Sequence, residues 1–165
     1  MRIKLLLIIV LFTFCFTTAS ANKIRRTNNF KSYNDPSQEI GYSLNLSYLR
    51  YEKSFSPQLH LHYAKYLTDY FSLGFGYGGI YDIHLHNTIN AEFSFRFSEK
   101  LIFSLKPGLV FKNVRGNTNL NYSVGFEANY EIKLSDDIHI GPSFEINYMQ
   151  DDLNLLAGFH MGFSF

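Results

Sequence analysis

Residues 153–165, LNLLAGFHMGFSF, decide the fold of this chain. From Phe159 onward the side chains alternate without a break, and such a period of two residues is typical of a β-strand. One face carries Phe159, Met161, Phe163 and Phe165, and the other carries His160, Gly162 and Ser164. An aromatic face on a last strand that ends at Phe165 would invite aggregation in water. The stretch therefore indicates a strand whose bulky face contacts something other than water.

Seven earlier segments show the same alternation. Their apolar faces run over residues 40–48, 59–67, 71–77, 89–97, 101–111, 120–134 and 138–148. Tight turns are expected at 68–70, 98–100 and 135–137, and longer or more polar connections at 50–57, 80–84, 112–119 and 149–152. Alternating short and long connections predict an all-β fold, an eight-stranded antiparallel up-and-down transmembrane β-barrel with both ends of the chain at the short-turn rim.

The composition of the two faces predicts which one contacts lipid. A soluble lipid-binding barrel would turn its apolar face inward around a ligand. Here the polar face combines charged residues with glycine, serine and asparagine, which suit the narrow lumen that eight strands leave. The apolar face is bulky and aromatic, and its tyrosines lie near segment ends, as in an interfacial girdle.

The N-terminal residues predict export. Residues 1–21 carry Arg2 and Lys4, then an apolar run and Ala19-Ser20-Ala21, which is the pattern of a cleaved secretory signal peptide. Residues 22–38 are polar and lack sustained periodicity, so we expect a flexible periplasmic segment before the barrel at 39–165. The single cysteine, Cys15, lies in the predicted signal peptide, so the mature chain has no disulfide. Removing Arg2 and Lys4 changes the formal net charge from +1 to −1, and no basic excess for nucleic-acid binding remains.

Counting back from the predicted turns places charged residues together in the lumen. Glu92 falls opposite Lys106, and Glu127 falls opposite Glu145. The two adjacent carboxylates require a neighbouring cation, either Lys106, Arg96 or His160, or else a shared proton. We therefore expect an ion network that fills the barrel, formed by Glu92, Arg96, Lys106, Glu127, Glu131, Glu145 and His160. By the same count His60 faces Gly78 and His62 faces Gly76, so imidazoles fill the space that glycines leave.

Two further patterns bear on metal binding and on strand geometry. Two His-x-His pairs, His60/His62 and His84/His86, lie about six residues apart along their strands, roughly 15 to 20 Å, too far to share one metal ion. Neither a metal nor another cofactor is predicted. Pro107 and Pro142 each fall inside a predicted strand beside a glycine, where we expect β-bulges.

The barrel segment resembles the small outer-membrane β-barrel proteins of Gram-negative bacteria, such as the OmpA and OmpX barrel domains. The stretches YLTDYFSLGFGYG, FRFSEKLIFSLKPGL and YEIKLSDDIHIGPSFEINY look most like the porin-like barrel proteins of Bacteroidetes. The resemblance implies a non-enzymatic monomer in the outer membrane, in contact with outer-membrane lipids. It also implies delivery to the barrel assembly machinery through Phe159, Met161, Phe163 and Phe165.

Three alternatives stay open at this point. One is a narrow porin-like channel, and another is the soluble lipid-binding barrel. The third is a lipid A-modifying enzyme, which would need serine, histidine and an acid on the lipid-facing surface, where the sequence places almost no serine or histidine.

Overall fold

The computed structural model describes residues 38–82, 86–114, 117–150 and 152–165. The predicted signal peptide at 1–21, most of the predicted segment at 22–38, and His84 lie outside these residues. The described chain is all-β, with strands β1 (Gln38–Leu49), β2 (Ser54–Thr68), β3 (Phe71–Ile80), β4 (His86–Arg96), β5 (Leu101–Val114), β6 (Asn117–Tyr130), β7 (Ile132–Lys133), β8 (Ile138–Met149) and β9 (Asp152–Ser164).

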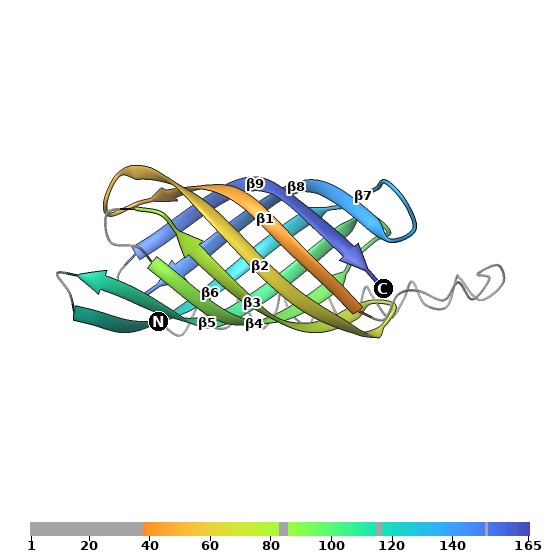
Figure 1. The fold of residues 1–165 in the computed structure, drawn as a ribbon, viewed down its shortest axis with the longest axis horizontal. Coiled ribbons are helices and arrows are strands. Elements are labelled where there is room, and N and C mark those ends of the chain that lie inside the picture. The colour runs from red at the N-terminus through yellow and green to blue at the C-terminus, as the bar shows by residue number, and fades with distance from the viewer. Residues whose placement is uncertain (1–37, 83–85, 115–116, 151) are drawn as a thin grey trace, which may run out of the picture. The chain divides into compact units, whose positions relative to one another are not determined.

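The strands form one closed antiparallel barrel. Neighbours in sequence pair with each other, and β1 pairs with β9 to close the wall. The short β7 continues β6 in the same register against β8 (Figure 1). The nine strands therefore make eight strand positions around the wall, here called staves. The prediction of an eight-stranded up-and-down barrel is confirmed, including the pairs Glu127–Glu145, His60–Gly78 and His62–Gly76.

The predicted bulges at the two prolines are wrong. Pro107 pairs with Val124 and Pro142 pairs with Phe159, with no register shift in either ladder. Each proline lies beside a gap in the ladder on its other side, because proline has no backbone N–H to donate there. Among the described strands a register shift occurs only between Tyr66 and Thr68.

The connections differ from the predicted contrast between short and long. On the rim that holds Gln38 and Phe165 they span residues 69–70, 97–100 and 134–137. On the opposite rim, here called the far rim, they span 50–53, 81–85, 115–116 and 150–151, and only the five residues of 81–85 exceed the longest connection of the first rim. The expected loop at 112–119 is instead paired as the end of the β5–β6 hairpin, which extends beyond the neighbouring strands (Figure 1). The far rim therefore presents a projecting hairpin rather than long loops.

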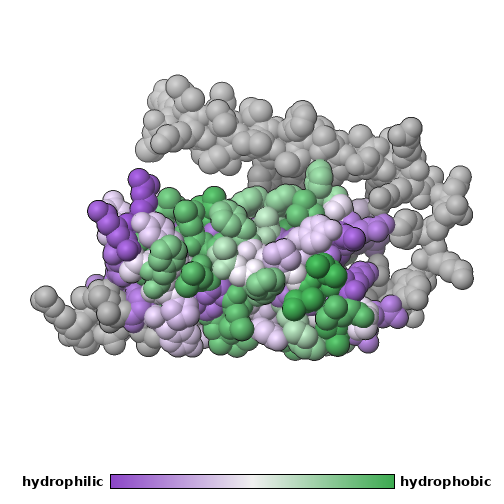
Figure 2. Space-filling model, turned by 90° about the horizontal axis from the view of Figure 1, so that it is seen from above, coloured by the Kyte–Doolittle hydropathy of each residue, from purple (hydrophilic) through white to green (hydrophobic). Residues whose placement is uncertain are grey.

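Burial in this barrel is inverted relative to a water-soluble protein. Exposed large apolar side chains come from every long strand, for example Leu44 (59%), Phe75 (63%) and Phe159 (64%). The buried side chains are mainly polar or charged, for example Glu92 (4%), Lys106 (3%) and Glu127 (4%). On the face shown in Figure 2, apolar side chains cover the middle of the wall and hydrophilic side chains gather towards its two ends. The polar face of each strand thus points inward, as the sequence predicted.

Candidate functional site

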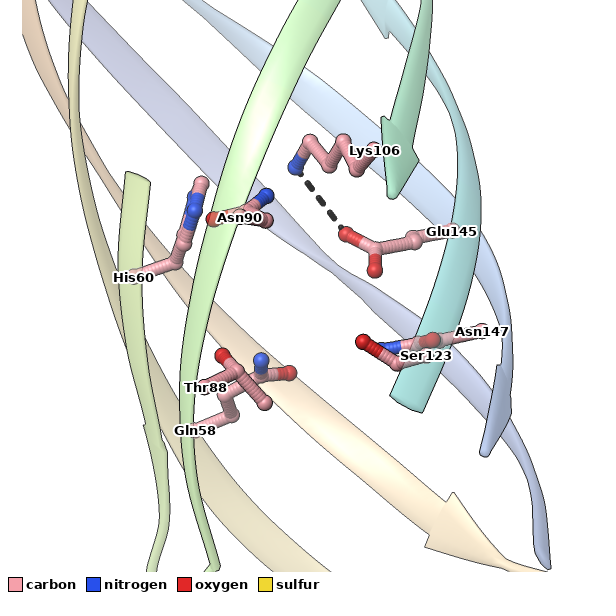
Figure 3. Close-up of a pocket in the computed structure, with 8 residues that line it drawn as sticks. All are labelled: Gln58, His60, Thr88, Asn90, Lys106, Ser123, Glu145 and Asn147. Atoms are coloured by element: carbon pink, nitrogen blue, oxygen red, sulfur yellow. Dashed lines mark hydrogen bonds and ion pairs between the residues drawn. The ribbon is translucent and has the colours of Figure 1, made fainter. Parts of the chain in front are cut away.

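The centre of the lumen is organised around Lys106 on β5. Glu127 on β6 and Glu145 on β8 are directly opposite each other in the ladder. The Nζ atom of Lys106 lies 2.7 Å from Glu127 Oε2 and 3.1 Å from Glu145 Oε2, and its bond to Glu145 is drawn in Figure 3. All three side chains are buried, so a single cation neutralises the repulsion between two adjacent carboxylates.

Glu92 has a different partner from the one expected. Its Oε1 atom lies 3.1 Å from His60 Nε2 and accepts a hydrogen bond from Asn90 Nδ2 at 3.3 Å. The ammonium group of Lys106 pairs instead with the two carboxylates of Glu127 and Glu145. The predicted cross-strand pair of Glu92 with Lys106 is not among the ion pairs of the described residues.

A second group of charges lies near the rim that holds the chain termini. The Nη1 atom of Arg96 donates to Glu131 Oε2 at 2.9 Å, and Arg96 Nη2 donates to the Tyr66 hydroxyl at 3.3 Å. Tyr66 in turn donates to Glu39 Oε2 at 2.6 Å. Sequence reasoning missed Glu39, although it precedes Ile40 and so lies on the polar face of the first strand.

His160 lies in this second group, where its Nε2 atom is 3.9 Å from Glu39 Oε1, and it forms no ion pair with Glu127 or Glu145 among the described residues. Its ring lies between those of His62 and His139, with centroids 5.1 Å away in each case. His139 was also missed, although it alternates with Ile138 and Ile140 on the inner face of β8. The imidazoles do fill space above glycines: a Cβ atom on Gly41, directly opposite His62, would lie 2.7 Å from His62 Nε2, and one on Gly76, diagonal to His60, would collide with His60 Nε2.

An apolar layer lies inside the barrel at its far rim. It consists of the inward-facing residues Leu49, Ile80, Val110 and Met149, which are at most 2% exposed. Each occupies a position of the inner, otherwise polar, face of its strand, and this shift in the alternation is the signal that could have revealed the layer. Because apolar side chains do not hydrate, the layer restricts entry of water and ions from the far rim.

The remaining free space in the lumen is small. One cavity of about 10 Å³ is lined by Gln58, His60, Thr88, Asn90, Lys106, Ser123, Glu145 and Asn147 (Figure 3). A second, of about 30 Å³, borders Glu39, His62, Glu131 and His160 among others. A water molecule needs roughly 10–15 Å³, so each of these two spaces has room for only a few isolated waters.

The C-terminal strand places its aromatic face on the outer wall. Phe159, Phe163 and Phe165 are 64%, 40% and 58% exposed, and Met161 shares their face. The Sδ atom of Met161 accepts a hydrogen bond from the Tyr42 hydroxyl at 3.0 Å across the β1–β9 seam. These four residues therefore combine an outward apolar surface with the closure of the barrel.

No helix in the part of the chain that the structure describes is long and apolar enough to cross a membrane.

The barrel is similar to solved structures of small bacterial β-barrels. Neisserial surface protein A aligns with a TM-score of 0.59 at 8% identity over 78% of this chain and 96% of that one. The N-terminal β-barrel domain of Pseudomonas aeruginosa OprF gives 0.58 at 15% identity over 77% and 97%. The Yersinia pestis outer membrane protein Ail, in a phospholipid bilayer nanodisc, gives 0.52 at 11% identity over 77% and 99%. At these identities the likeness concerns the fold.

No protein-family model matches the chain. No curated protein sequence matches it either.

Proposed function

We propose that this chain is an integral outer-membrane β-barrel protein with a non-enzymatic role, either structural or in surface interaction. The observation that carries the proposal is the inverted burial, with apolar side chains covering the wall and charged side chains filling the lumen. Exposing so much apolar surface to water is unfavourable, whereas the same surface against lipid chains is stable. We expect a monomer, since among the described residues the wall closes on itself and only the projecting end of the β5–β6 hairpin has unpaired edges.

Three further observations support the outer membrane as the location. The sequence begins with a pattern typical of a secretory signal peptide. Exposed tyrosines lie near the far ends of their strands, including Tyr77, Tyr122 and Tyr148, where a membrane interface favours aromatic rings. The similar barrel of Ail is an outer membrane protein and was solved in a lipid bilayer. The resemblance to the porin-like barrel proteins of Bacteroidetes concerns the bacterial group in which such barrels occur, and it indicates no activity.

The filled lumen favours a structural role over a narrow channel. Lys106 and its two carboxylates occupy the centre, and the apolar layer of Leu49, Ile80, Val110 and Met149 closes the far rim. Conduction would require both to rearrange. The surface-interaction role is assigned to the far rim, where the β5–β6 hairpin projects.

The other two alternatives fit the geometry less well. A soluble lipid-binding barrel needs an apolar interior, and the described interior is polar, so that alternative is contradicted. A lipid A-modifying enzyme needs histidine on the outer wall, whereas the five histidines that the structure describes all point into the lumen.

The proposal is tested with a pair of arginine substitutions. Leu44 lies midway along β1 and is 59% exposed, whereas Tyr51 lies in the connection at the far rim and is 78% exposed. Arginine at the bilayer midplane costs about 2–4 kcal/mol, and near the interface about 0–1. We expect Leu44→Arg to lower the amount of protein in the outer-membrane fraction severalfold and Tyr51→Arg to leave it unchanged.

The readout is mobility on a denaturing gel with and without boiling. The wild-type barrel in the outer-membrane fraction should stay compact in cold detergent and shift when heated. Recovery of the wild type in the soluble periplasmic fraction, or equal tolerance of both substitutions, would contradict lipid contact at the wall.

A further inference from the structure

Four neighbouring staves direct a histidine or a glutamate to one point in the lumen. Glu39 lies on β1, His62 on β2, His139 on β8 and His160 on β9. Gly41 pairs with His62 on one side and Gly162 on the other, and a Cβ atom at Gly41 would lie 2.7 Å from His62 Nε2 and 2.8 Å from His160 Nε2. The glycine thus leaves the space in which the imidazoles converge.

The nitrogen atoms surround a single carboxylate oxygen. Glu39 Oε1 lies 3.3 Å from His62 Nε2, 3.6 Å from His139 Nε2 and 3.9 Å from His160 Nε2. The donor atoms of Glu39, His62 and His160 all lie within 4.8 Å of one another. Tetrahedral zinc with bonds of about 2 Å places its ligand atoms roughly 3.3 Å apart, so small side-chain movements would bring these donors to bonding distance.

One oxygen atom of each carboxylate in this group accepts a hydrogen bond from a neighbouring side chain. The Oε2 atom of Glu39 accepts from Tyr66, and the Oε2 atom of Glu131 accepts from Arg96. The Oε1 atom of each carboxylate faces the histidines, and Glu131 Oε1 lies 3.4 Å from His139 Nε2. Outer-shell bonds of this kind orient metal ligands and fix their position.

Two of the imidazole Nε2 atoms lack hydrogen bonds among the described residues. The Nε2 atoms of His139 and His160 contact carboxylates only at 3.4 Å or more, and their side chains are only 8% and 5% exposed. Buried polar atoms without hydrogen bonds are uncommon in native proteins, and a bound water or ion is one way to satisfy them. The larger cavity, of about 30 Å³, borders His160, His62 and Glu39, which leaves room beside them for an ion and a water ligand.

The charges near this point are not balanced by permanent cations. Arg96 pairs with Glu131 and reaches Glu39 only through the Tyr66 hydroxyl, and Lys106 is engaged by Glu127 and Glu145. One negative charge therefore remains beside the three imidazoles. Either a protonated imidazole or a bound cation must balance it, because an unpaired buried charge is strongly unfavourable.

We propose that this part of the lumen is a binding site for a divalent transition-metal ion of the zinc class. Its ligands are Glu39, His62 and His160, with His139 as the adjacent fourth donor. Imidazole and carboxylate together suit zinc, cobalt, nickel and copper, whereas calcium and magnesium require mainly oxygen ligands. This set differs from the His-x-His pairs weighed in the sequence, because it joins strands that lie at opposite ends of the chain.

The test uses the untagged full chain, folded in detergent micelles and stripped of metal with EDTA. Co²⁺ is titrated as a visible-absorption probe, and Zn²⁺ is then added to displace it. We expect saturation near one equivalent and the absorption spectrum of a four-coordinate site. His62→Gln, His160→Gln and Glu39→Gln should each raise the Kd at least about tenfold.

The matched control is His86→Gln. His86 is equally buried, lies near the far rim and forms a separate group with Glu52 and Asp82. Its substitution should leave the Co²⁺ Kd unchanged within about twofold. Loss of binding in His86→Gln, with retention in His62→Gln and His160→Gln, would overturn the proposal and move the site to the far rim.

A second measurement needs no variant and so does not depend on variant folding. In the ¹⁵N spectrum of histidine in the wild-type protein, Zn²⁺ should shift the Nε2 signals of His62 and His160. His60 Nε2 faces Glu92 at 3.1 Å and serves as the internal reference, which should not shift. Absence of saturable binding, or Zn²⁺ shifts confined to other histidines, would show that a protonated imidazole alone balances the charge, and the proposal would be wrong.

Discussion

At the scale of single residues, Lys106 is the cation that joins two carboxylates in the described lumen. It is buried between Glu127 and Glu145, which the strand register places opposite each other. Removing one partner of a buried charge cluster leaves the others uncompensated, which typically costs about 3–5 kcal/mol. We therefore expect Lys106→Met to lower the free energy of unfolding of the barrel by that amount.

Urea unfolding in micelles, followed by the gel shift, measures this effect. Lys112→Met is the matched control, because Lys112 lies 3.6 Å from Glu52 in a more exposed pair and should contribute less than about 1 kcal/mol. Equal destabilisation by the two substitutions would contradict the central role of Lys106. Adding Glu127→Gln and Glu145→Gln to Lys106→Met should restore much of the stability, since the repulsion is then removed.

At the scale of elements, register could be predicted only where a tight turn fixed it. The turn before β8 allowed the Glu127–Glu145 pair to be counted from the sequence. The pairing of β1 with β9 has no turn to count from, since Tyr42 and Met161 are 119 residues apart. The sequence therefore could not predict that Glu39 and His160 lie close together. The inward direction of each side chain, in contrast, could be predicted from the alternation.

The last strand supports a prediction about assembly. Gln38 and Phe165 exchange two backbone hydrogen bonds of 3.1 and 2.9 Å. Deleting Phe165 should cost about 1–3 kcal/mol of stability for these bonds. If the strand is also read by the assembly machinery, the deletion should lower the amount of assembled barrel in cells far more than it slows refolding of the purified chain into micelles.

Phe144→Ser is the control for this deletion. It removes an aromatic ring that is 49% exposed on β8, opposite Ala157 but outside the four outward-facing residues of the C-terminal strand. The ratio of assembled to total protein in cells, compared with refolding yield in vitro, separates recognition from stability. A similar loss of assembly in both variants would count against a signal in Phe159, Met161, Phe163 and Phe165.

At the scale of the whole molecule, side chains block the lumen at two positions along its axis. Ion pairs fill the centre, and the apolar layer formed by Leu49, Ile80, Val110 and Met149 closes the far rim. We expect no sustained channels in planar bilayers from the wild type. Met149→Ala, which shortens one side chain of the layer, should remain silent because the charged plug persists, whereas persistent unitary currents from the wild type would favour the channel alternative.

The β1–β9 seam also sets the order in which the molecule can form. Seven of the eight strand pairings around the wall join neighbours in sequence and can form from local turns. The eighth, between β1 and β9, can form only after both ends of the wall are in place. Joining such distant segments is entropically slow. Until then the protein is an open curved sheet with two unsatisfied edges, β1 and β9, and one of them carries the exposed rings of Phe159 and Phe163. The interval before closure is thus when the chain most needs protection from pairing with its neighbours.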